Sequence, residues 1–286
     1  MILALPGNEG FAARLGAAAA IDVHTFPDGE SRVRVPVSVA GQEVVVVASL
    51  DRPDAKFLPL AFALAAIRDL GARRVRLVSP YLCYMRQDRA FAPGEAVSAG
   101  IFAELLSGLC DGVVTVDPHL HRIASLDEIY RVPTIAVRAA SAISTWVREN
   151  VPNPVIIGPD GESAQWAEEV ARGAGAPSTV LLKARHGDRD VEVTVPDLHR
   201  WSGRTPVLVD DIVSTARTMG AAARHLRAAG TPPPICVVVH ALFAAGAAEE
   251  LASTGVNRVV SCNTVPHQTN AIDVAHLVAT ALLESK

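Results

Sequence analysis

Lysine is nearly missing from this 286-residue sequence. Only Lys56, Lys183 and Lys286 occur among its 26 basic residues, so arginine supplies almost all the positive charge. A bias of composition toward arginine is the simplest explanation of this scarcity. The formal net charge is −4, and no segment is a run of basic residues. Because a nucleic-acid groove normally carries a basic cluster, we expect no nucleic-acid partner.

Cysteine pairs and long apolar runs are also missing. The four cysteines lie far apart with no C-x-x-C pair, which argues against a zinc knuckle and a disulfide framework. We therefore expect reduced, mostly buried thiols in a cytoplasmic protein. No apolar run approaches the ~20 residues of a membrane span, and the first residues lack the basic start of a secretory signal. We expect no membrane partner.

Several catalytic motifs are absent as well. The sequence contains no G-x-x-x-x-G-K-[ST], G-x-G-x-x-G, H-E-x-x-H or G-x-S-x-G. These absences leave no support for a P-loop, a dinucleotide fingerprint, a zincin or a serine hydrolase.

The sequence does show a regular alternation of two patterns. Continuous apolar runs, typical of strands buried on both faces, are predicted as strands at 43–50, 73–80, 112–117, 133–137, 154–160, 178–184, 205–211, 234–243 and 258–265. Helical patterns lie between them at 56–71, 99–110, 163–175, 219–230 and 244–255. This alternation predicts an α/β fold with parallel sheets.

The alternation is interrupted once, where residues 148–158 hold two prolines and two asparagines. We expect a domain boundary near residues 140–150, with domains at 1–145 and 146–286. The two halves look like copies of one architecture, although they share no clear repeat in sequence.

Ligands of open α/β sheets bind beyond the carboxyl ends of the strands. The clearest such end is at 207–209, followed by Asp210 and Asp211 and then by Ser214, Thr215 and Thr218 before a helix. Hydroxyl groups and free backbone N–H groups at a helix start can bind an anion, and carboxylates can accept from sugar hydroxyls. The segment indicates a sugar-phosphate site, with an ordinary helix cap as the alternative.

Two further strand ends carry candidate ligands. His119 and His121 closely follow Asp117, where they could bind a metal or phosphate or belong to a structural turn. Asp160 follows a Gly-Pro pair, where it could hold a cation or cap the next helix.

Charged and aromatic residues crowd three other segments. The first is residues 81–89, which begins with Tyr81, Tyr84 and Arg86. Its side chains are of types that can bind phosphate and purine. The F-P-D-G-E sequence at 26–30 predicts a turn. Lys183 and Arg185 follow a strand in what we expect to be a flexible loop, where two cations could neutralise a transferring phosphoryl group.

Taken in order, these segments resemble the ribose-phosphate pyrophosphokinases, the phosphoribosyl pyrophosphate synthetases. The resemblance runs over essentially the whole chain and includes G-N at 7–8, F-P-D-G-E, R-Q-D-R followed by P-G-E, V-D-P-H, G-P-D, K-x-R and V-D-D-I-V-S-T-A-R-T. It implies two type I phosphoribosyltransferase-like domains with mainly parallel sheets. It also implies transfer of the pyrophosphoryl group of Mg-ATP to the C1 hydroxyl of ribose 5-phosphate.

The resemblance assigns roles residue by residue. It places ATP at Phe26, Asp28, Glu30, Arg86, Gln87, Asp88 and His119. It places Mg²⁺ near His119 and Asp160, and catalysis at Lys183 and Arg185. It places ribose 5-phosphate at Asp210, Asp211, Ser214, Thr215, Ala216, Arg217 and Thr218. Because the first three ATP residues act across a subunit interface in the family, it implies at least a homodimer.

The sequence departs from the family pattern at several positions. Ala216 and Arg217 stand where a Gly-Gly pair is usual, and a Cβ at Ala216 obstructs phosphate if that residue needs a positive φ. Glu162 and Ser163 replace a Gly-rich pair. These differences indicate a divergent subgroup of the family.

Two other functions remain open at this point. A phosphoribosyltransferase fits the segment around Asp210, although the N-terminal motifs argue against it. A non-catalytic paralogue that regulates a synthetase is the second, and the joint presence of Lys183, Arg185, His119 and Asp160 argues against that one.

Overall fold

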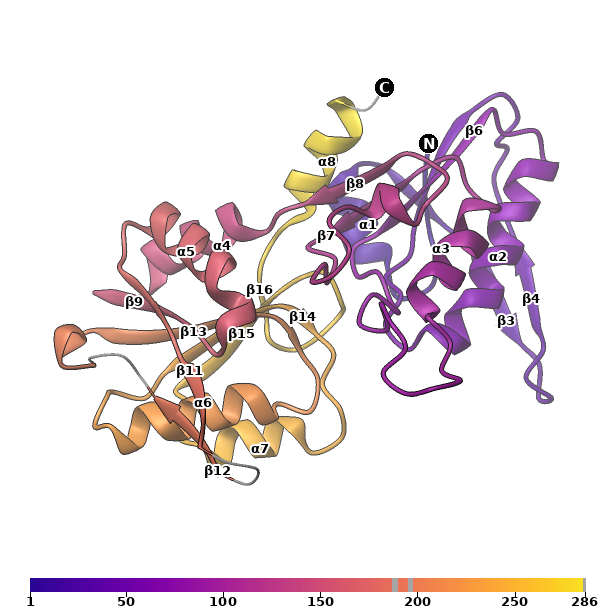
Figure 1. Cartoon of the computed structure of the whole chain (residues 1–286). Helices are drawn as coiled ribbons and strands as arrows, with labels where there is room; N and C mark the ends of the chain where they lie inside the picture. Colours follow the sequence, from indigo (N-terminus) through magenta and orange to yellow (C-terminus); the bar gives the residue numbers. More distant parts are fainter. Residues whose placement is uncertain (187–189, 195–197, 285–286) are drawn as a thin grey trace. The chain divides into compact units, whose positions relative to one another are not determined.

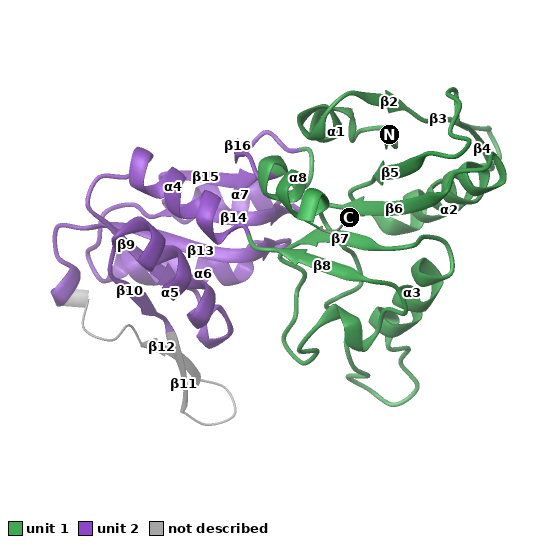
Figure 2. Cartoon of the chain, turned by 90° about the horizontal axis from the view of Figure 1, so that it is seen from above, with its two compact units in different colours: residues 1–138, 264–266, 275–286 green, residues 139–263, 267–274 purple. Residues whose placement is uncertain are grey.

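The computed structural model describes residues 1–186, 190–194 and 198–284; for 182–186, 190–194 and 198–199 it describes the backbone alone. The chain forms two compact units (Figure 2). Unit 1 contains Met1–Arg138, Thr264–Pro266 and Ala275–Lys286, and unit 2 contains Ala139–Asn263 and His267–Val274.

Unit 1 is built on a six-stranded parallel sheet in the order β2-β1-β5-β6-β7-β8. Figure 1 labels β6, β7 and β8 of this sheet. Its strands are β1 (Ile2–Ala4), β2 (Ala18–Ala20), β5 (Glu43–Val47), β6 (Arg74–Ser79), β7 (Val113–Val116) and β8 (Thr134–Val137). Its helices are α1 (Glu9–Leu15), α2 (Pro53–Asp69), α3 (Ser98–Ser107) and α8 (Ala275–Glu284). An antiparallel hairpin of β3 (Asp22–Thr25) and β4 (Ser31–Arg34) is inserted between β2 and β5.

Unit 2 repeats this plan with the order β10-β9-β13-β14-β15-β16. Its strands are β9 (Pro154–Gly158), β10 (Ser178–Val180), β13 (Thr205–Val213), β14 (Ile235–Ala241), β15 (Arg258–Cys262) and β16 (Asn270–Ile272). Its helices are α4 (Ala140–Asn150), α5 (Ala164–Ala174), α6 (Arg217–Ala228) and α7 (Ala247–Ser253). A hairpin of β11 (Leu182–His186) and β12 (Asp190–Thr194) is inserted between β10 and β13.

Both sheets reverse their strand order at one point. In unit 1 the chain moves outward from β1 to β2 and then back to β5 on the other side, and in unit 2 it does the same around β9. A crevice forms at the carboxyl ends of the strands where the order reverses, and open α/β sheets bind ligands there. The two reversal points, β1/β5 and β9/β13, are therefore the first places to look for a site.

The core of unit 2 explains why its strands are continuous apolar runs. Leu208 and Val238 on the sheet pack with Ala223 and Leu226 of α6 and with Leu251 of α7. All four cysteines are free and buried, which confirms the expectation of buried thiols. Within the described residues, no helix has both the length and the apolar character that a membrane crossing requires.

The α/β fold with mainly parallel sheets is confirmed, but some elements differ from the prediction. The run 178–184 forms two strands, because β10 pairs with β9 whereas β11 turns away to pair with β12. Strands β1 and β2 were not predicted, because each has only three residues and so carries too little periodicity.

The compact units divide between Arg138 and Ala139. Helix α4, in the segment where a boundary was expected, packs on α5 of unit 2, and Ser144 Oγ donates to Val170 O at 2.9 Å. Gly173 permits this approach, because a Cβ there would lie 2.5 Å from Ser144 Oγ. The C-terminal helix α8 packs with α1 of unit 1. Domain limits at 1–145 and 146–286 stay a prediction.

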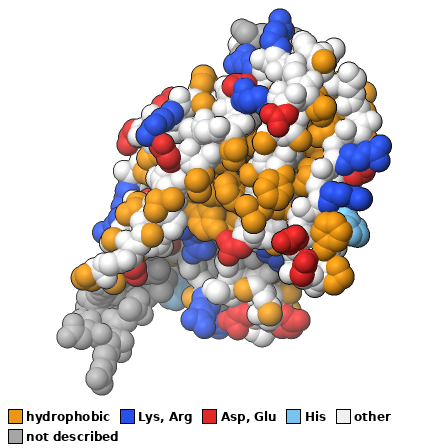
Figure 3. Space-filling view, turned by 90° about the vertical axis from the view of Figure 1, so that its right-hand side faces the viewer, with side chains coloured by type: hydrophobic (Ala, Val, Ile, Leu, Met, Phe, Trp, Pro, Cys, Tyr) orange, Lys and Arg blue, Asp and Glu red, His pale blue; other side chains and the backbone are white. Residues whose placement is uncertain are grey.

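One face of unit 1 is rich in exposed hydrophobic side chains (Figure 3). Leu58 and Phe62 lie one turn apart on α2, and Ile101 and Leu105 lie one turn apart on α3. The two helices touch through the rings of Phe57 and Phe102, whose centroids lie 5.2 Å apart. We call the exposed residues Leu58, Phe62, Ile101 and Leu105 the α2/α3 face.

Candidate active site

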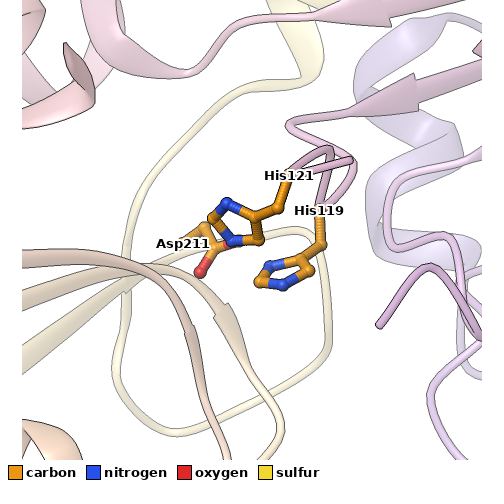
Figure 4. A group of neighbouring side chains, drawn as sticks. All are labelled: His119, His121 and Asp211. Atoms are coloured by element: carbon orange, nitrogen blue, oxygen red, sulfur yellow. The ribbon is translucent and has the colours of Figure 1, made fainter. Parts of the chain in front are cut away.

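The carboxylates of unit 2 gather at the β9/β13 reversal point. Asp210 and Asp211 directly follow the buried residues 207–209, as expected, and both lie within β13, where Asp210 pairs in register with Val238 of β14 (Figure 4 labels Asp211). Burial raises the pKa of Asp210 well above its usual range, and the negative charges of Asp211 and Asp160 raise it further. Three acidic groups therefore share this edge of the sheet.

Asp160 follows β9 and caps the 3₁₀ turn Gly161–Ser163. Its Oδ1 accepts from the backbone N–H of Glu162 at 3.1 Å and of Ser163 at 3.3 Å, and Ser163 Oγ donates back to Asp160 O at 2.7 Å. Gly158 leaves room for this cap, since a Cβ there would lie 2.5 Å from Ser163 Oγ. The capping alternative is therefore observed, and metal binding by Asp160 stays a prediction.

The segment 214–218 connects β13 to α6 through an unusual residue. Ala216 has φ 63°, a left-handed conformation that favours glycine, and it immediately precedes the first residue of α6. Its carbonyl accepts from Gly220 N at 2.7 Å, and Ser214 O accepts from Ala244 N at 3.1 Å. Ala216 therefore does have the positive φ at which its Cβ was expected to obstruct a phosphate, and its buried side chain lies in the turn.

A cavity of about 550 Å³ lies beside this segment, within unit 2. Thr215 and Arg217 line it together with Arg224, Glu250 and the backbone around Gly246. Arg224 pairs with Glu250 at 2.8 Å. Arg217 is exposed and has no ion pair or hydrogen bond within the described part of the chain. Thr218 is exposed as well.

Lys183 and Arg185 lie in β11, opposite Val193 and Val191 of β12. The sequence placed them in a loop after a strand, so this position is a correction that follows from the hairpin pairing. Their side chains lie outside what the structure describes.

In unit 1, the predicted histidines follow β7. Asp117 has φ 34°, an uncommon conformation for a residue other than glycine, and its N–H donates to Val137 O at 2.8 Å. His119 and His121 come next with their rings edge to face, the centroids 3.9 Å apart (Figure 4). The Asp117 turn is therefore followed at the carboxyl edge of the sheet by two imidazoles, of which that of His119 is partly exposed and that of His121 exposed.

The segment that follows β6 carries the R-Q-D-R residues. Arg86 is exposed and has no hydrogen bond or ion pair among the described residues. Gln87 N donates to Tyr84 O at 3.0 Å. Asp88 differs, because its side chain is only 2% exposed and its carboxylate pairs with Arg122 at 3.0 Å. Arg122 was missed by sequence reasoning, although its position directly after His121 was a usable signal.

Residues 26–30 form the tip of the β3–β4 hairpin, as predicted for F-P-D-G-E. Phe26 N donates to Glu30 O at 2.8 Å, Glu30 N donates to Asp28 Oδ1 at 3.1 Å, and Gly29 supplies φ 92°. Phe26, Asp28 and Glu30 are all exposed. An exposed aromatic ring with two carboxylates on a hairpin tip is available to a ligand or a partner.

Comparison with known proteins gives consistent matches over both units. The family model described as "Phosphoribosyl transferase domain" matches residues 125–279, and "N-terminal domain of ribose phosphate pyrophosphokinase" matches residues 9–109. A ribose-phosphate pyrophosphokinase of Methanopyrus kandleri is 38% identical, covering 92% of this chain and 90% of its own. One of Halobacterium salinarum is 35% identical, covering 99% and 100%.

A solved structure shows the same similarity. The crystal structure of phosphoribosylpyrophosphate synthetase from Mycobacterium smegmatis superposes with a TM-score of 0.87 at 26% identity, covering 100% of this chain and 99% of that one. Both units and their connection order are therefore shared with that structure.

Proposed function

The chain belongs to the ribose-phosphate pyrophosphokinase family, and we propose that it transfers the β,γ-pyrophosphoryl group of Mg-ATP to the C1 hydroxyl of ribose 5-phosphate. The oxygen of the C1 hydroxyl attacks the β-phosphorus, the bond from that phosphorus to the oxygen bridging to the α-phosphorus breaks so that AMP leaves with this oxygen, and the proton of the C1 hydroxyl is released. The products are phosphoribosyl pyrophosphate and AMP. The observation that carries the proposal is the 38% identity to a protein of this name over nearly the whole chain.

We assign ribose 5-phosphate to the β13–α6 segment of unit 2. Thr215 and Thr218 supply hydroxyl groups, the first turn of α6 supplies unpaired backbone N–H groups, and Arg217 supplies an unpaired guanidinium. Ser214 and Ala216 shape the turn, while Asp210 and Asp211 accept hydrogen bonds from the sugar hydroxyls. These features support an anion site next to a hydroxyl-binding site.

We assign ATP to the loops and the hairpin tip of unit 1. Arg86 and Gln87 offer a guanidinium and an amide to the phosphates and the purine. His119 lies at the next strand end, where an imidazole N–H can donate to a phosphate oxygen. Phe26 offers an exposed ring for stacking on adenine, with Asp28 and Glu30 on the same tip.

The residues of unit 2 fit a magnesium ion. Mg²⁺ prefers oxygen ligands and is commonly held by one or two carboxylates together with waters and substrate phosphates. Asp160 and Asp210 offer carboxylate oxygens, and the raised pKa of Asp210 reflects an accumulation of negative charge that a cation would relieve. His119 is the other residue that the family resemblance associates with the metal. When bound, Mg²⁺ would neutralise charge on the phosphates of ATP.

Lys183 and Arg185 are the proposed catalytic residues. In phosphoryl transfer little covalent chemistry falls to the protein, so catalysis is mainly positioning and electrostatic stabilisation. Two cations from β11 would offset the negative charge that develops on the bridging oxygen and on the transferring group. Neither residue needs to act as a general base in this account.

We also propose that the enzyme is a cytoplasmic homodimer or a larger homo-oligomer. The α2/α3 face would otherwise leave four large hydrophobic side chains in water on two adjoining helices, which is typical of an interaction surface. A homodimer would bring the hairpin tip of one subunit to the ATP residues of the other.

A mixing experiment tests the shared ATP site. Phe26→Ala and Arg86→Ala should each be nearly inactive at low ATP. Subunits of the two variants mixed one to one should recover about a quarter of the wild-type activity, because half of the dimers would be mixed and each mixed dimer would hold one complete site. No recovery after verified subunit exchange, or full activity of a monomer in sedimentation, contradicts the shared site.

The reaction itself is tested by identifying the products. Incubation with Mg-ATP and ribose 5-phosphate, followed by ³¹P NMR and mass analysis, should give AMP and phosphoribosyl pyrophosphate in equal amounts. Formation should stop without ribose 5-phosphate or with excess EDTA. Production of ADP alone would overturn the proposal. Base-dependent release of pyrophosphate would indicate a phosphoribosyltransferase, and tight association with another synthetase without turnover would indicate a regulatory paralogue.

A further inference from the structure

A buried carboxylate joins two strand-end loops of unit 1. The side chain of Asp88 is 2% exposed, and Arg122 Nη1 donates to its two oxygens at 3.0 and 3.2 Å. Asp88 lies in the segment between β6 and α3, and Arg122 lies in the loop after β7. Since β6 and β7 are neighbours in the sheet, the ion pair bridges two adjacent loops at its carboxyl edge.

A second contact reinforces this bridge. The Arg122 guanidinium lies over the Phe91 ring, 5.8 Å from its centroid, and Arg89 lies over the same ring at 4.9 Å. Phe91 is itself held, because its N–H and that of Ala92 donate to Glu95 Oε2 at 2.7 and 3.0 Å. Arg122 therefore contacts the segment at both an anionic and an aromatic group.

The residues on either side of this bridge are the ones proposed to bind ATP. Arg86 and Gln87 immediately precede Asp88, and His119 lies three residues before Arg122. The segment between β6 and α3 has no helix or strand around Arg86. Backbone hydrogen bonds of Gln87 to Tyr84 O and from Ala99 N hold it locally, and the Asp88–Arg122 pair links it to the loop after β7. The Asp88 carboxylate is enclosed and paired, which suits an anchor better than a ligand for a polyanion.

We propose that the Asp88–Arg122 pair is a positioning device that holds Arg86 and Gln87 at a set distance from His119, so that Arg122 controls ATP binding without touching ATP. This inference rests on the proposed assignment of ATP to unit 1. In this proposal Asp88 anchors Arg122 rather than binding ATP itself, and Arg122 joins the residues that the function requires.

The test compares two arginine substitutions in unit 1. Arg122→Gln should raise the KM for ATP roughly tenfold to a hundredfold, because a displacement of about 1 Å in a binding group can cost that much, and should leave the KM for ribose 5-phosphate unchanged. Arg122→Lys should restore most of the loss, since a single donor atom makes both contacts with Asp88. The matched control is Arg131→Gln, which removes an exposed ion pair with Glu104 at 2.8 Å elsewhere in unit 1.

Two further measurements separate positioning from loss of folding. Asp88→Asn/Arg122→Gln removes both charges, so it leaves no unpaired buried carboxylate; it should fold like wild type yet show the same rise in KM for ATP. The imidazole NMR signals of His119 and His121 should shift in Arg122→Gln and remain in place in Arg131→Gln, with no substrate present. The NMR comparison does not depend on which nucleotide the enzyme uses. If the imidazole signals do not shift, the positioning role is wrong, whether or not the proposed reaction is right.

Some outcomes would overturn the positioning role. One is an equal rise in KM for both substrates that tracks the melting temperature, which would indicate a purely structural pair. Others are identical behaviour of Arg122→Gln and Arg131→Gln, or no rescue by Arg122→Lys.

Discussion

The two units share a scaffold and differ in what occupies the reversal point of the sheet. Their strand orders correspond, and each has an antiparallel hairpin inserted at the same place. The helix after the reversal begins behind a left-handed residue in both, Arg52 with φ 53° before α2 and Ala216 with φ 63° before α6. Backbone geometry alone therefore does not distinguish them.

The side chains at the two points are opposite in character. In unit 1, Asn8 Oδ1 accepts from Ser49 N at 2.7 Å, and Lys56 Nζ donates to Ser49 O at 3.0 Å and to Asp51 at 2.5 Å. In unit 2, Asp160, Asp210 and Asp211 lie where their charges oppose one another. The polar groups at the reversal point of unit 1 therefore bond to one another, whereas those of unit 2 keep an excess of negative charge that a ligand can offset. The difference supports the proposed assignment of ribose 5-phosphate to unit 2 and of ATP to the loops and the hairpin of unit 1.

The largest expected effect comes from the lysines of the two units. Lys183→Ala should lower kcat by about 10³-fold or more, because removing a cation from a phosphoryl-transfer site typically costs that much, and should leave the melting temperature unchanged. Lys56→Ala should instead destabilise the fold by about 1 kcal/mol, since the partly exposed pair is screened by solvent, and leave kcat of the folded enzyme intact. Steady-state kinetics and thermal denaturation measure both. Equal losses of kcat in Lys183→Ala and Lys56→Ala would contradict the difference in function between the two units.

Asn8→Ala tests the hydrogen bonds at the reversal point of unit 1. Asn8 is buried and bonds to Ser49 N and to the carbonyls of Leu5 and Pro6, so removing its amide leaves buried groups unpaired. We expect a loss of about 2 kcal/mol in the free energy of unfolding, measured by urea denaturation. A loss of ATP binding with unchanged stability would instead mean that Asn8 belongs to a site.

The shared left-handed residues can be tested as a pair. Arg52→Gly and Ala216→Gly should each stabilise the protein by about 0.5–1 kcal/mol. Glycine adopts a positive φ without strain, and the relief of that strain should exceed the free energy lost because glycine gives the unfolded chain more conformational entropy. Ala222→Gly, inside α6, is the matched control and should destabilise by about 1 kcal/mol. Opposite signs at positions 52 and 216, in parallel denaturation curves, would show that the two turns are not equivalent.

The smallest expected effect concerns pH. The pKa of Asp210 is raised in the folded state, so folding loses stability as pH rises through the carboxylate range, and the penalty persists at neutral pH. Asp210→Asn should therefore be more stable than wild type at pH 7 in EDTA, and the difference should shrink toward pH 4. Asp51→Asn in unit 1 serves as the comparison, because Asp51 pairs with Lys56 rather than with other acids, and it should show no such gain. A difference independent of pH would contradict repulsion as the cause.

Local patterns predicted much of this molecule. The buried strands β5, β6, β7, β9, β13 and β14 were visible as apolar runs, and the F-P-D-G-E turn followed from its Pro-Asp-Gly sequence. Short elements such as β1 were invisible, because they are formed by pairing with β5 rather than by their own propensity. The same reason hid Arg122, whose partner Asp88 lies 34 residues away.

By itself, the sequence determined the α/β class, the parallel sheets and the order of the family motifs, because apolar runs, turn residues and motif spacing are local properties. Tertiary structure decided which residues meet: that Asp88 pairs with Arg122, that Lys56 bonds to Ser49 O, and that Asp160 and Asp210 repel. Those outcomes depend on strand order and burial, which arise only when distant segments pack together. Only the fold therefore distinguishes two of the few lysines: Lys56 donates a hydrogen bond to Ser49 O in unit 1, whereas Lys183 lies on the β11–β12 hairpin of unit 2.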